Sequence, residues 1–188
     1  MTSAAVVALA ALLLVACAAQ TPSAPAAAAA AIPTPAVPAL RNPGFEEPTP
    51  AQARCPAGWE CSAHVDVGSF SFRRAAEGAA GAASLCIERI GKEPWALLTQ
   101  AFHTTAMRGR TLRLSMAMRA HGLEGGAGPW IQSQGGRAHA AKLVQATKGW
   151  ERVAVELAIP AESNLLVVGA TLEGAGRACF DDIRLEVL

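Results

Sequence analysis

The chain has 188 residues, and its 16 Lys and Arg residues nearly balance its 15 Asp and Glu residues, for a formal net charge of +1. This charge offers no electrostatic footprint for nucleic acid or for an anionic membrane surface, so we exclude nucleic acid as a partner. Hydrophobic residues make up 52% of the chain, but much of this is alanine, only 5% is aromatic and tyrosine is absent. We therefore expect one domain with a lean core.

The N-terminus carries an apolar run, residues 4–16, that is shorter than the roughly 20 residues needed to span a bilayer. Its length is typical of the core of a signal peptide. The run ends in Leu14-Val15-Ala16-Cys17, which resembles the lipobox of bacterial lipoproteins, in which the cysteine is acylated and becomes the mature N-terminus. We predict a signal peptide over residues 1–16 and a lipid anchor, such as palmitate, on Cys17.

The region before the apolar run departs from the usual signal-peptide pattern, because it contains no Lys or Arg. A positive charge there would have to come from the amine of Met1, or the start codon has been placed too late. The alternative to a lipoprotein is an ordinary signal peptide, cleaved after a small-residue motif formed by Ala16 and Ala18.

Residues 17–40 have the composition of a disordered tether. The segment after Cys17 contains Ala, Pro, Ser and Thr with no charged residue until Arg41. Its prolines remove backbone N–H donors and bias each preceding residue toward extended structure, which favours a semi-rigid spacer over a helix. The composition changes near residue 40, so we place the folded domain at residues 41–188.

The folded part has the pattern of an all-β protein, in which short runs of alternating apolar residues are separated by Gly, Pro, Asn or Asp. Residues 111–118 give the clearest period of two, and both faces of residues 165–172 are apolar, as in a central strand. Strands are predicted at 84–90, 97–103, 111–118, 130–134, 152–160, 165–172 and 178–187. So many short strands without crossover helices predict a β-sandwich.

Six short motifs then resemble, in order and rough spacing, the galactose-binding-like jelly-roll domains, which include carbohydrate-binding modules of bacterial glycosidases. They are Asn42-Pro43-Gly44-Phe45-Glu46, Gly58-Trp59, Ser84-Leu85-Cys86-Ile87, Leu98-Thr99-Gln100, Gly149-Trp150-Glu151-Arg152 and Phe180-Asp181-Asp182-Ile183-Arg184-Leu185. The resemblance covers the whole of residues 41–188 and implies a jelly-roll β-sandwich. It also implies that Trp59 and Trp150 help to fill the core.

Four cysteines remain besides Cys17, namely Cys55, Cys61, Cys86 and Cys179. An even number in an exported domain favours disulfides, for which three pairings are possible. Zinc binding is the alternative, but no pair has the C-x-x-C spacing that brings two thiolates to one ion.

Strand parity sends the side chains of Cys86 and Cys179 away from the core. If their strands are neighbours, as the resemblance implies, the two sulfur atoms meet across one face of the sheet. Cys55 and Cys61 would then close the short turn that presents Trp59.

The sequence offers little for catalysis. His64 and Asp66 are the nearest approach to a catalytic His/Asp pair, but nearness in sequence is not triad geometry and no G-x-S-x-G motif is present. We predict that the protein is not an enzyme and keep a hydrolase as a minor alternative.

The resemblance also implies a structural calcium site. In many such jelly rolls the glutamate of the N-x-G-F-E opening and an aspartate of the D-D pair bind one calcium ion, and these positions are Glu46 and Asp181 or Asp182 here. Calcium takes six to eight oxygen ligands, which carbonyl groups of residues 79–83 could complete. The alternative is that Asp182 caps backbone N–H groups at a bulge, with no cofactor bound.

Ligand-binding candidates come from outward-facing positions on the predicted strands. Alternation sends Trp130, Gln132 and Gln134 to the outer face of their strand, and the same parity exposes Arg113. An indole beside amide and guanidinium donors suits stacking on a sugar ring with hydrogen bonds to its hydroxyl groups. Trp95, at the start of a strand, is a second aromatic candidate. A half-buried Trp130 under a loop is the alternative.

We therefore expect a non-catalytic lipoprotein of the cell envelope that binds a glycan; the alternative partner is an envelope protein. Ala18 follows the cysteine in place of the aspartate that retains many lipoproteins at the inner membrane. This predicts anchoring to the outer membrane, facing the periplasm.

Overall fold

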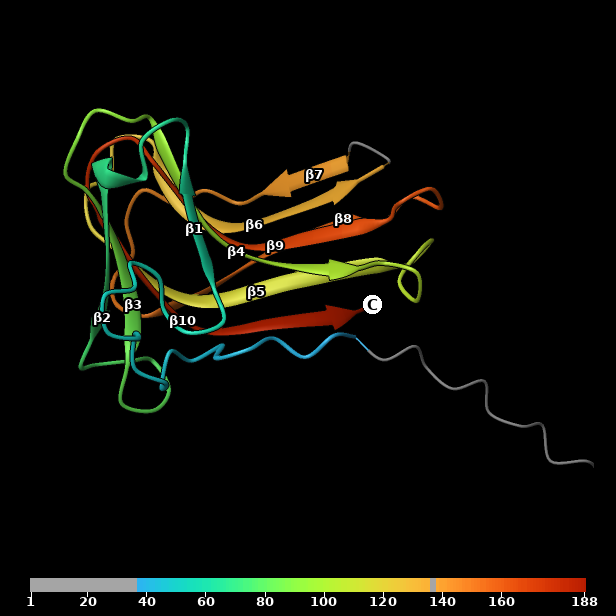
Figure 1. Ribbon diagram of the computed structural model, residues 1–188, viewed down its shortest axis with the longest axis horizontal. Helices are drawn as coiled ribbons and strands as arrows, with labels where there is room; N and C mark the ends of the chain where they lie inside the picture. Colours follow the sequence, from blue (N-terminus) through green and yellow to red (C-terminus); the bar gives the residue numbers. More distant parts are fainter. Residues whose placement is uncertain (1–36, 136–137) are drawn as a thin grey trace, which may run out of the picture. The chain divides into compact units, whose positions relative to one another are not determined.

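The computed structural model describes residues 37–135 and 138–188, and within these ranges the protein is a sandwich of two five-stranded antiparallel sheets (Figure 1). One sheet has the strand order β1-β4-β9-β6-β7 and the other has the order β2-β3-β10-β5-β8. The strands are β1 (Glu60–Ala63), β2 (Phe70–Ala75), β3 (Ser84–Arg89), β4 (Trp95–His103), β5 (Thr111–Ala120), β6 (Gly126–Gln134), β7 (Ala138–Ala141), β8 (Glu151–Ala158), β9 (Leu165–Glu173) and β10 (Arg177–Val187), with one 3₁₀ turn, η1 (Val67–Ser69).

All seven predicted strands are present, and the all-β jelly-roll prediction is confirmed. The sequence did not reveal β1, β2 and β7. Two of these, β1 and β7, have only four residues and few large apolar side chains, and β2 loses its alternation at Arg73 and Arg74. The predicted signal peptide, Cys17 and nearly all of the tether lie outside the described residues.

The core lies between the sheets and is built by the inward parity of each strand. In β5, Leu112, Leu114, Met116 and Met118 are fully buried, whereas Thr111 and Arg113 are only partly covered. The strand β9 is central in its sheet, as its two apolar faces predicted, and pairs with β4 on one side and β6 on the other.

Two tryptophans that the resemblance assigned to the core have different positions. Trp59 is 5% exposed, packs against Phe45 with 5.6 Å between ring centroids, and donates its indole N–H to the Asn42 carbonyl oxygen. Trp150 instead lies half-buried at the surface, where the Arg119 guanidinium covers its ring. The core assignment of Trp150 is therefore wrong, because its segment ends just before β8 on the outer side of the sandwich.

Both predicted disulfides are present. Cys86 and Cys179 are register partners on β3 and β10, with their Cα atoms 3.9 Å apart. Their side chains lie on the face of the sheet opposite Leu85 and Phe180, as parity predicted, yet they are only 2% and 5% exposed. The other bond joins Cys55 to Cys61 across the turn before β1. All four thiols are therefore bonded, and none of them is a zinc ligand.

The strand β10 joins the two halves of its sheet. Its first part pairs with β3, and it pairs with β5 along most of its length, with a register shift between Asp181 and Arg184. Asp182 has a φ of 46° at this bulge. In Figure 1 most strands lie roughly along the horizontal axis of the view, with antiparallel neighbours, whereas β1, β2 and β3 are steeply inclined at one end of the sandwich.

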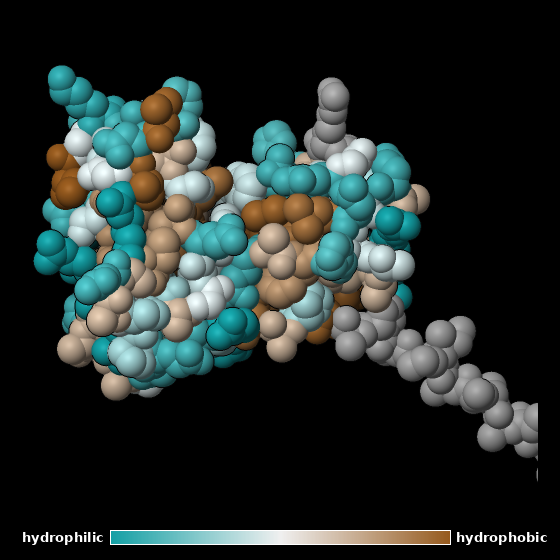
Figure 2. Space-filling view, viewed as in Figure 1, coloured by the Kyte–Doolittle hydropathy of each residue, from teal (hydrophilic) through white to brown (hydrophobic). Residues whose placement is uncertain are grey.

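Apolar side chains are mostly withdrawn from the surface. On the side shown in Figure 2, hydrophobic residues form small separate groups among hydrophilic ones. Large exposed hydrophobic residues in the described ranges are Val65, Ile90 and Leu188. No helix in those ranges has the length and apolar character needed to cross a membrane.

Candidate functional site

Two tryptophans share the outer face of the sheet that contains β9. Trp95 opens β4 and Trp130 lies in β6, and these two strands flank β9 on opposite sides. Trp130 is the register partner of Gly169, where a Cβ atom would collide with the Leu98 carbonyl oxygen. Only glycine fits there, so no side chain from β9 covers the sheet directly beside the Trp130 indole.

The two indoles line a surface depression of about 330 Å³, which we call the tryptophan depression. Its lining residues come from the three strands β4, β6 and β9 and are Trp95, Leu97, Trp130, Gln132, Thr171 and Glu173. Outward parity places all six on one face, because the side chains of successive residues in a strand point to opposite sides. The depression therefore has apolar walls with an amide and a carboxylate between them.

The polar groups of the depression differ in their freedom to bind a ligand. The Thr171 hydroxyl is buried and donates to the Ala96 carbonyl oxygen at 3.2 Å, so its hydrogen is already used. Gln132 and Glu173 are only partly covered. An amide that both donates and accepts, beside a carboxylate that accepts, is a suitable set for hydroxyl groups.

A short chain of contacts holds Trp95 at the rim of the depression. The His64 ring meets the Trp95 ring edge-on, with 6.0 Å between centroids. His64 Nδ1 lies 3.4 Å from Glu93 Oε2, which also accepts the Val65 N–H at 3.0 Å. Glu93 therefore fixes the segment after β1, and His64 in turn limits the positions available to the Trp95 indole.

Comparison with known proteins gives structural matches only. No family model matches the sequence, and no curated protein matches it. The carbohydrate-binding module TmCBM61, solved in complex with β-1,4-galactotriose, is similar with a TM-score of 0.53 and 18% identity over 79% of this chain and 97% of that chain. A structure described as CBM4 is similar with a TM-score of 0.55 and 20% identity, covering 80% of this chain and 100% of that one.

The domain has the jelly-roll fold of carbohydrate-binding modules. A third similar structure is the enzymatically active domain of tailspike protein 4 from bacteriophage CBA120, with a TM-score of 0.55 and 10% identity. That match covers 70% of this chain but only 20% of the tailspike chain. At these identities the likeness concerns the fold.

The jelly roll brings together three of the five predicted ligand-binding residues. Trp95, Trp130 and Gln132 all line the tryptophan depression. Gln134 lies two residues further along β6 on the same face, at an exposed position outside the depression. Their role in binding stays a prediction.

The placement of Arg113 corrects the sequence interpretation. Arg113 lies on β5 in the other sheet, where its guanidinium donates to Glu156 Oε1 at 2.6 and 3.0 Å. It does not lie beside Trp130, so the prediction that it joins the indole in one site is wrong. Strand parity gave its outward direction correctly but could not show which sheet the strand would join.

The sequence interpretation missed Leu97, Thr171 and Glu173. The signal was present, because the parity that buries Leu172 sends Thr171 and Glu173 to the opposite face. Using it would have required knowing that β9 pairs with both β4 and β6.

The two aspartates offered as calcium ligands beside Glu46 have different positions: Asp181 contacts the same turn as Glu46, and Asp182 pairs with arginines. Glu46 Oε1 accepts the Ala82 and Ala83 N–H groups at 2.9 and 3.2 Å, and Asp181 Oδ2 accepts the Ala80 N–H at 2.8 Å. The turn over residues 79–83 thus directs N–H donors at both carboxylates. No group of three or more Asp, Glu, His or Cys side chains in the described ranges is arranged to hold a metal ion.

Asp182 has turned away from the other two carboxylates. Its carboxylate pairs with Arg184 at 2.7 Å and with Arg152. The alternative, that Asp182 caps backbone N–H groups at the bulge, is wrong for Asp182, because the partners of its carboxylate in the described residues are arginines. Asp181 takes this role and accepts the Asp182 N–H at 2.6 Å. The residues present do not fit a calcium ion that uses Asp182.

The two residues considered for hydrolysis have separate partners. Asp66 Oδ1 accepts the Gly68 N–H at 2.7 Å and caps η1, while His64 faces Glu93. Asp66 is therefore a capping residue, and the contacts of His64 belong to the rim of the tryptophan depression.

Proposed function

We propose that this domain binds a carbohydrate in the tryptophan depression, with the indoles of Trp95 and Trp130 as apolar platforms for sugar rings. The observation that carries the proposal is the convergence of two indoles from separate strands on one open depression of about 330 Å³. Its volume lies in the range of roughly 300–1,000 Å³ that is typical of ligand pockets. The fold supports the proposal, because it is that of carbohydrate-binding modules.

The charge of the depression favours a neutral glycan. Its lining contains one carboxylate, Glu173, and no Lys or Arg. A negatively charged sugar would meet Glu173 without a compensating cation, so it would lose affinity relative to its neutral counterpart. Gln132 and Glu173 would bind the hydroxyl groups at the edge of a ring that stacks on an indole.

A calorimetric titration with β-1,4-galactotriose and other neutral oligosaccharides tests the proposal. We expect Trp130→Ala and Trp95→Ala each to weaken binding by about tenfold or more, because aromatic anchors in binding sites carry roughly 2 kcal/mol or more. Trp150→Ala is the matched control, since it removes an indole outside the depression and should leave affinity unchanged. Wild-type protein that binds no neutral glycan would rule the proposal out, and pull-down of an envelope protein would then support an interaction module.

We also propose that the domain acts by binding and not by catalysis, and that it is held at the cell envelope. Acylation of Cys17 would anchor the chain, since each buried methylene contributes about 0.8 kcal/mol and more than one acyl chain gives stable attachment. With Ala18 after the cysteine, we propose the outer membrane, facing the periplasm. The tether would let the jelly roll reach glycans tens of ångströms from the bilayer, at about 3 Å per extended residue.

A further inference from the structure

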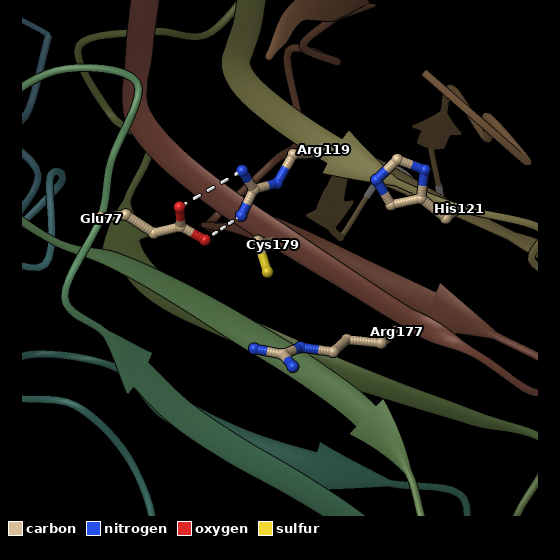
Figure 3. A pocket seen from close by; sticks show the side chains of 5 residues that line it. All are labelled: Glu77, Arg119, His121, Arg177 and Cys179. Carbon is tan, nitrogen blue, oxygen red and sulfur yellow. Dashed lines mark hydrogen bonds and ion pairs between the residues drawn. The ribbon is translucent and has the colours of Figure 1, made fainter. Parts of the chain in front are cut away.

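A second hollow lies on the other sheet, on its outer face. It has a volume of about 390 Å³ and lies over β10 and the end of β5. We call it the Arg177 hollow, and its lining residues are Glu77, Arg119, His121, Arg177 and Cys179 (Figure 3). It belongs to a different sheet from the tryptophan depression, so the two sites share no residue.

Arg119 forms one wall of the hollow and is held from two sides. Figure 3 shows both carboxylate oxygens of Glu77 facing its guanidinium, and the ring of Trp150 lies 5.0 Å from its central carbon. The Arg119 guanidinium lowers the pKa of the Glu77 carboxyl, which therefore stays ionised and offsets the charge of Arg119. The wall is fixed and nearly neutral.

Glu77 is itself positioned by the turn that follows it. The N–H groups of Ala80, Ala82 and Ala83 are bound by Asp181 and Glu46. The loop between β2 and β3 is thus tied to the rest of the sheet, and Glu77 does not depend on Arg119 alone for its place.

Arg177 is the remaining cation of the hollow. No ion pair in the described residues involves Arg177, although Glu88 is its register partner on β3. Its guanidinium also lines an adjoining hollow of about 230 Å³, whose other charged residues are Arg73 and Glu88. Arg73 likewise takes part in no ion pair within those ranges. Across both hollows, three arginines face two glutamates, and one of the glutamates is already paired with Arg119.

The floor between the two hollows is rigid. Cys179 lines one and Cys86 the other, and the disulfide between them joins β3 to β10. In Figure 3 the Arg119 and Arg177 side chains lie on either side of Cys179, with His121 at the side of the hollow. A ligand bound on this floor would contact the guanidinium of Arg177, which is in no ion pair among the described residues, and could also reach the imidazole of His121.

We propose that the Arg177 hollow binds an acidic sugar, a uronic acid residue, whose carboxylate is held by Arg177. The guanidinium presents parallel N–H donors that match the two oxygens of a carboxylate, and this arrangement is favoured at carboxylate-binding sites. One uncompensated positive charge suits a monoanion. The His121 imidazole, which also lines the hollow, can form a hydrogen bond with a hydroxyl group of the sugar.

NMR titration of the ¹⁵N-labelled full chain with galacturonate, and separately with galactose, tests this assignment. Galacturonate should shift the backbone amides of Arg177, His121 and Cys179, and galactose should not. Arg177→Gln should raise the dissociation constant at least about tenfold, as expected for loss of hydrogen bonds to a charged group. Arg113→Gln is the matched control, because it removes an arginine from the same sheet outside the hollow, and it should leave the titration unchanged.

Two results would overturn the assignment: no galacturonate shifts at these amides, or an Arg177→Gln variant that binds as tightly as wild type. Stronger binding of galactose 6-sulfate than of galacturonate would also overturn it, since the hollow would then recognise another anion. Trp130→Ala should weaken galactotriose binding without changing the galacturonate titration, so failure at either site is distinguishable from failure at the other.

Discussion

Asp181 is a fully buried carboxylate, with 0% of its surface exposed, beside the bulge of β10. Burial raises its pKa above the ordinary value of 3.8, and hydrogen bonds from the Ala80 and Asp182 N–H groups oppose this effect. Asp181 therefore stabilises two features: the bulge of β10, through the Asp182 N–H, and the turn after β2, through the Ala80 N–H.

The raised pKa gives Asp181 a distinct pH signature. The folded protein holds this proton more tightly than the unfolded chain, so the Asp181 contribution to stability falls as pH rises from about 3.8 to the folded pKa. We expect the free energy of unfolding of wild type, minus that of Asp181→Asn, to decrease over this window. Urea unfolding of both proteins at a series of pH values measures the difference. Glu77, whose pKa is lowered, contributes in the opposite direction but cancels because both proteins contain it.

A flat or rising difference would show that Asp181 has no raised pKa in the folded protein. The same unfolding curves recorded with added calcium and with a chelator should coincide, because Glu46 Oε1 and both carboxylate oxygens of Asp181 already accept backbone N–H groups.

At the scale of strands, β9 sets the spacing of the tryptophan depression. It lies between β4 and β6, and each of these strands is about 4.8 Å from β9. Trp95 and Trp130 therefore come from strands that are not neighbours. Gly169 allows β4 to approach β9 closely, since a Cβ atom there would meet the Leu98 carbonyl oxygen. The position of Trp95 relative to Trp130 therefore depends on a residue that has no side chain.

Gly169→Ala tests this dependence. The added methyl group must push β4 away, so we expect a loss of stability of roughly 1–3 kcal/mol, as for other overpacked sites, together with weaker glycan binding. Thermal unfolding and calorimetric titration report the two effects. Gly149→Ala is the matched control, because a Cβ atom at Gly149 has no atom within 4 Å, and both measurements should stay near wild type. Equal behaviour of the two variants would contradict the account.

At the scale of the whole molecule, two disulfides differ in what they constrain. Cys86–Cys179 joins residues 93 apart in sequence, whereas Cys55–Cys61 joins residues 6 apart. In the chain-entropy description, a longer loop loses more freedom in the unfolded state, which gives about 4–5 kcal/mol for the first bond and about 2 kcal/mol for the second.

Removing each bond separately checks this difference. We expect the Cys86→Ala/Cys179→Ala protein to lose about 2 kcal/mol more stability than the Cys55→Ala/Cys61→Ala protein in urea unfolding without reductant. Thiol probes should label none of these four cysteines in oxidised wild-type protein. Equal stability losses would show that native-state packing, and not the length of the closed loop, determines the contribution.

The anchoring of the whole molecule is tested by fractionation of native protein beside a Cys17→Ser variant. Because acylation needs the thiol, we expect native protein in the outer-membrane fraction and the variant in the soluble periplasmic fraction. A Cys55→Ser/Cys61→Ser protein is a control, since it loses cysteines that carry no lipid. Equal solubility of native protein and the Cys17→Ser variant would favour the ordinary signal peptide.

Much of the fold was accessible from the sequence because alternation is a local property. The period of two in residues 111–118 and 165–172 identified strands β5 and β9, and parity correctly turned Cys86 and Cys179 away from the core. The same reasoning put Trp130 and Gln132 on one outer face, where the structure places them together with Trp95. The short strands β1 and β7 escaped, because four residues with small or polar side chains carry too little periodicity.

The alternation of side chains along a strand determines the face of the sheet on which each side chain lies. For most strands the sequence by itself determined that face. Only the tertiary structure decided which sheet each strand joined, because long-range pairing depends on contacts among strands far apart in the chain. That decision separated Arg113 from Trp130 and joined Thr171 and Glu173 to the tryptophan depression. It also directed N–H groups at Glu46 and Asp181 and turned Asp182 toward arginines, since the directions of side chains at a bulge do not follow the regular alternation of a strand.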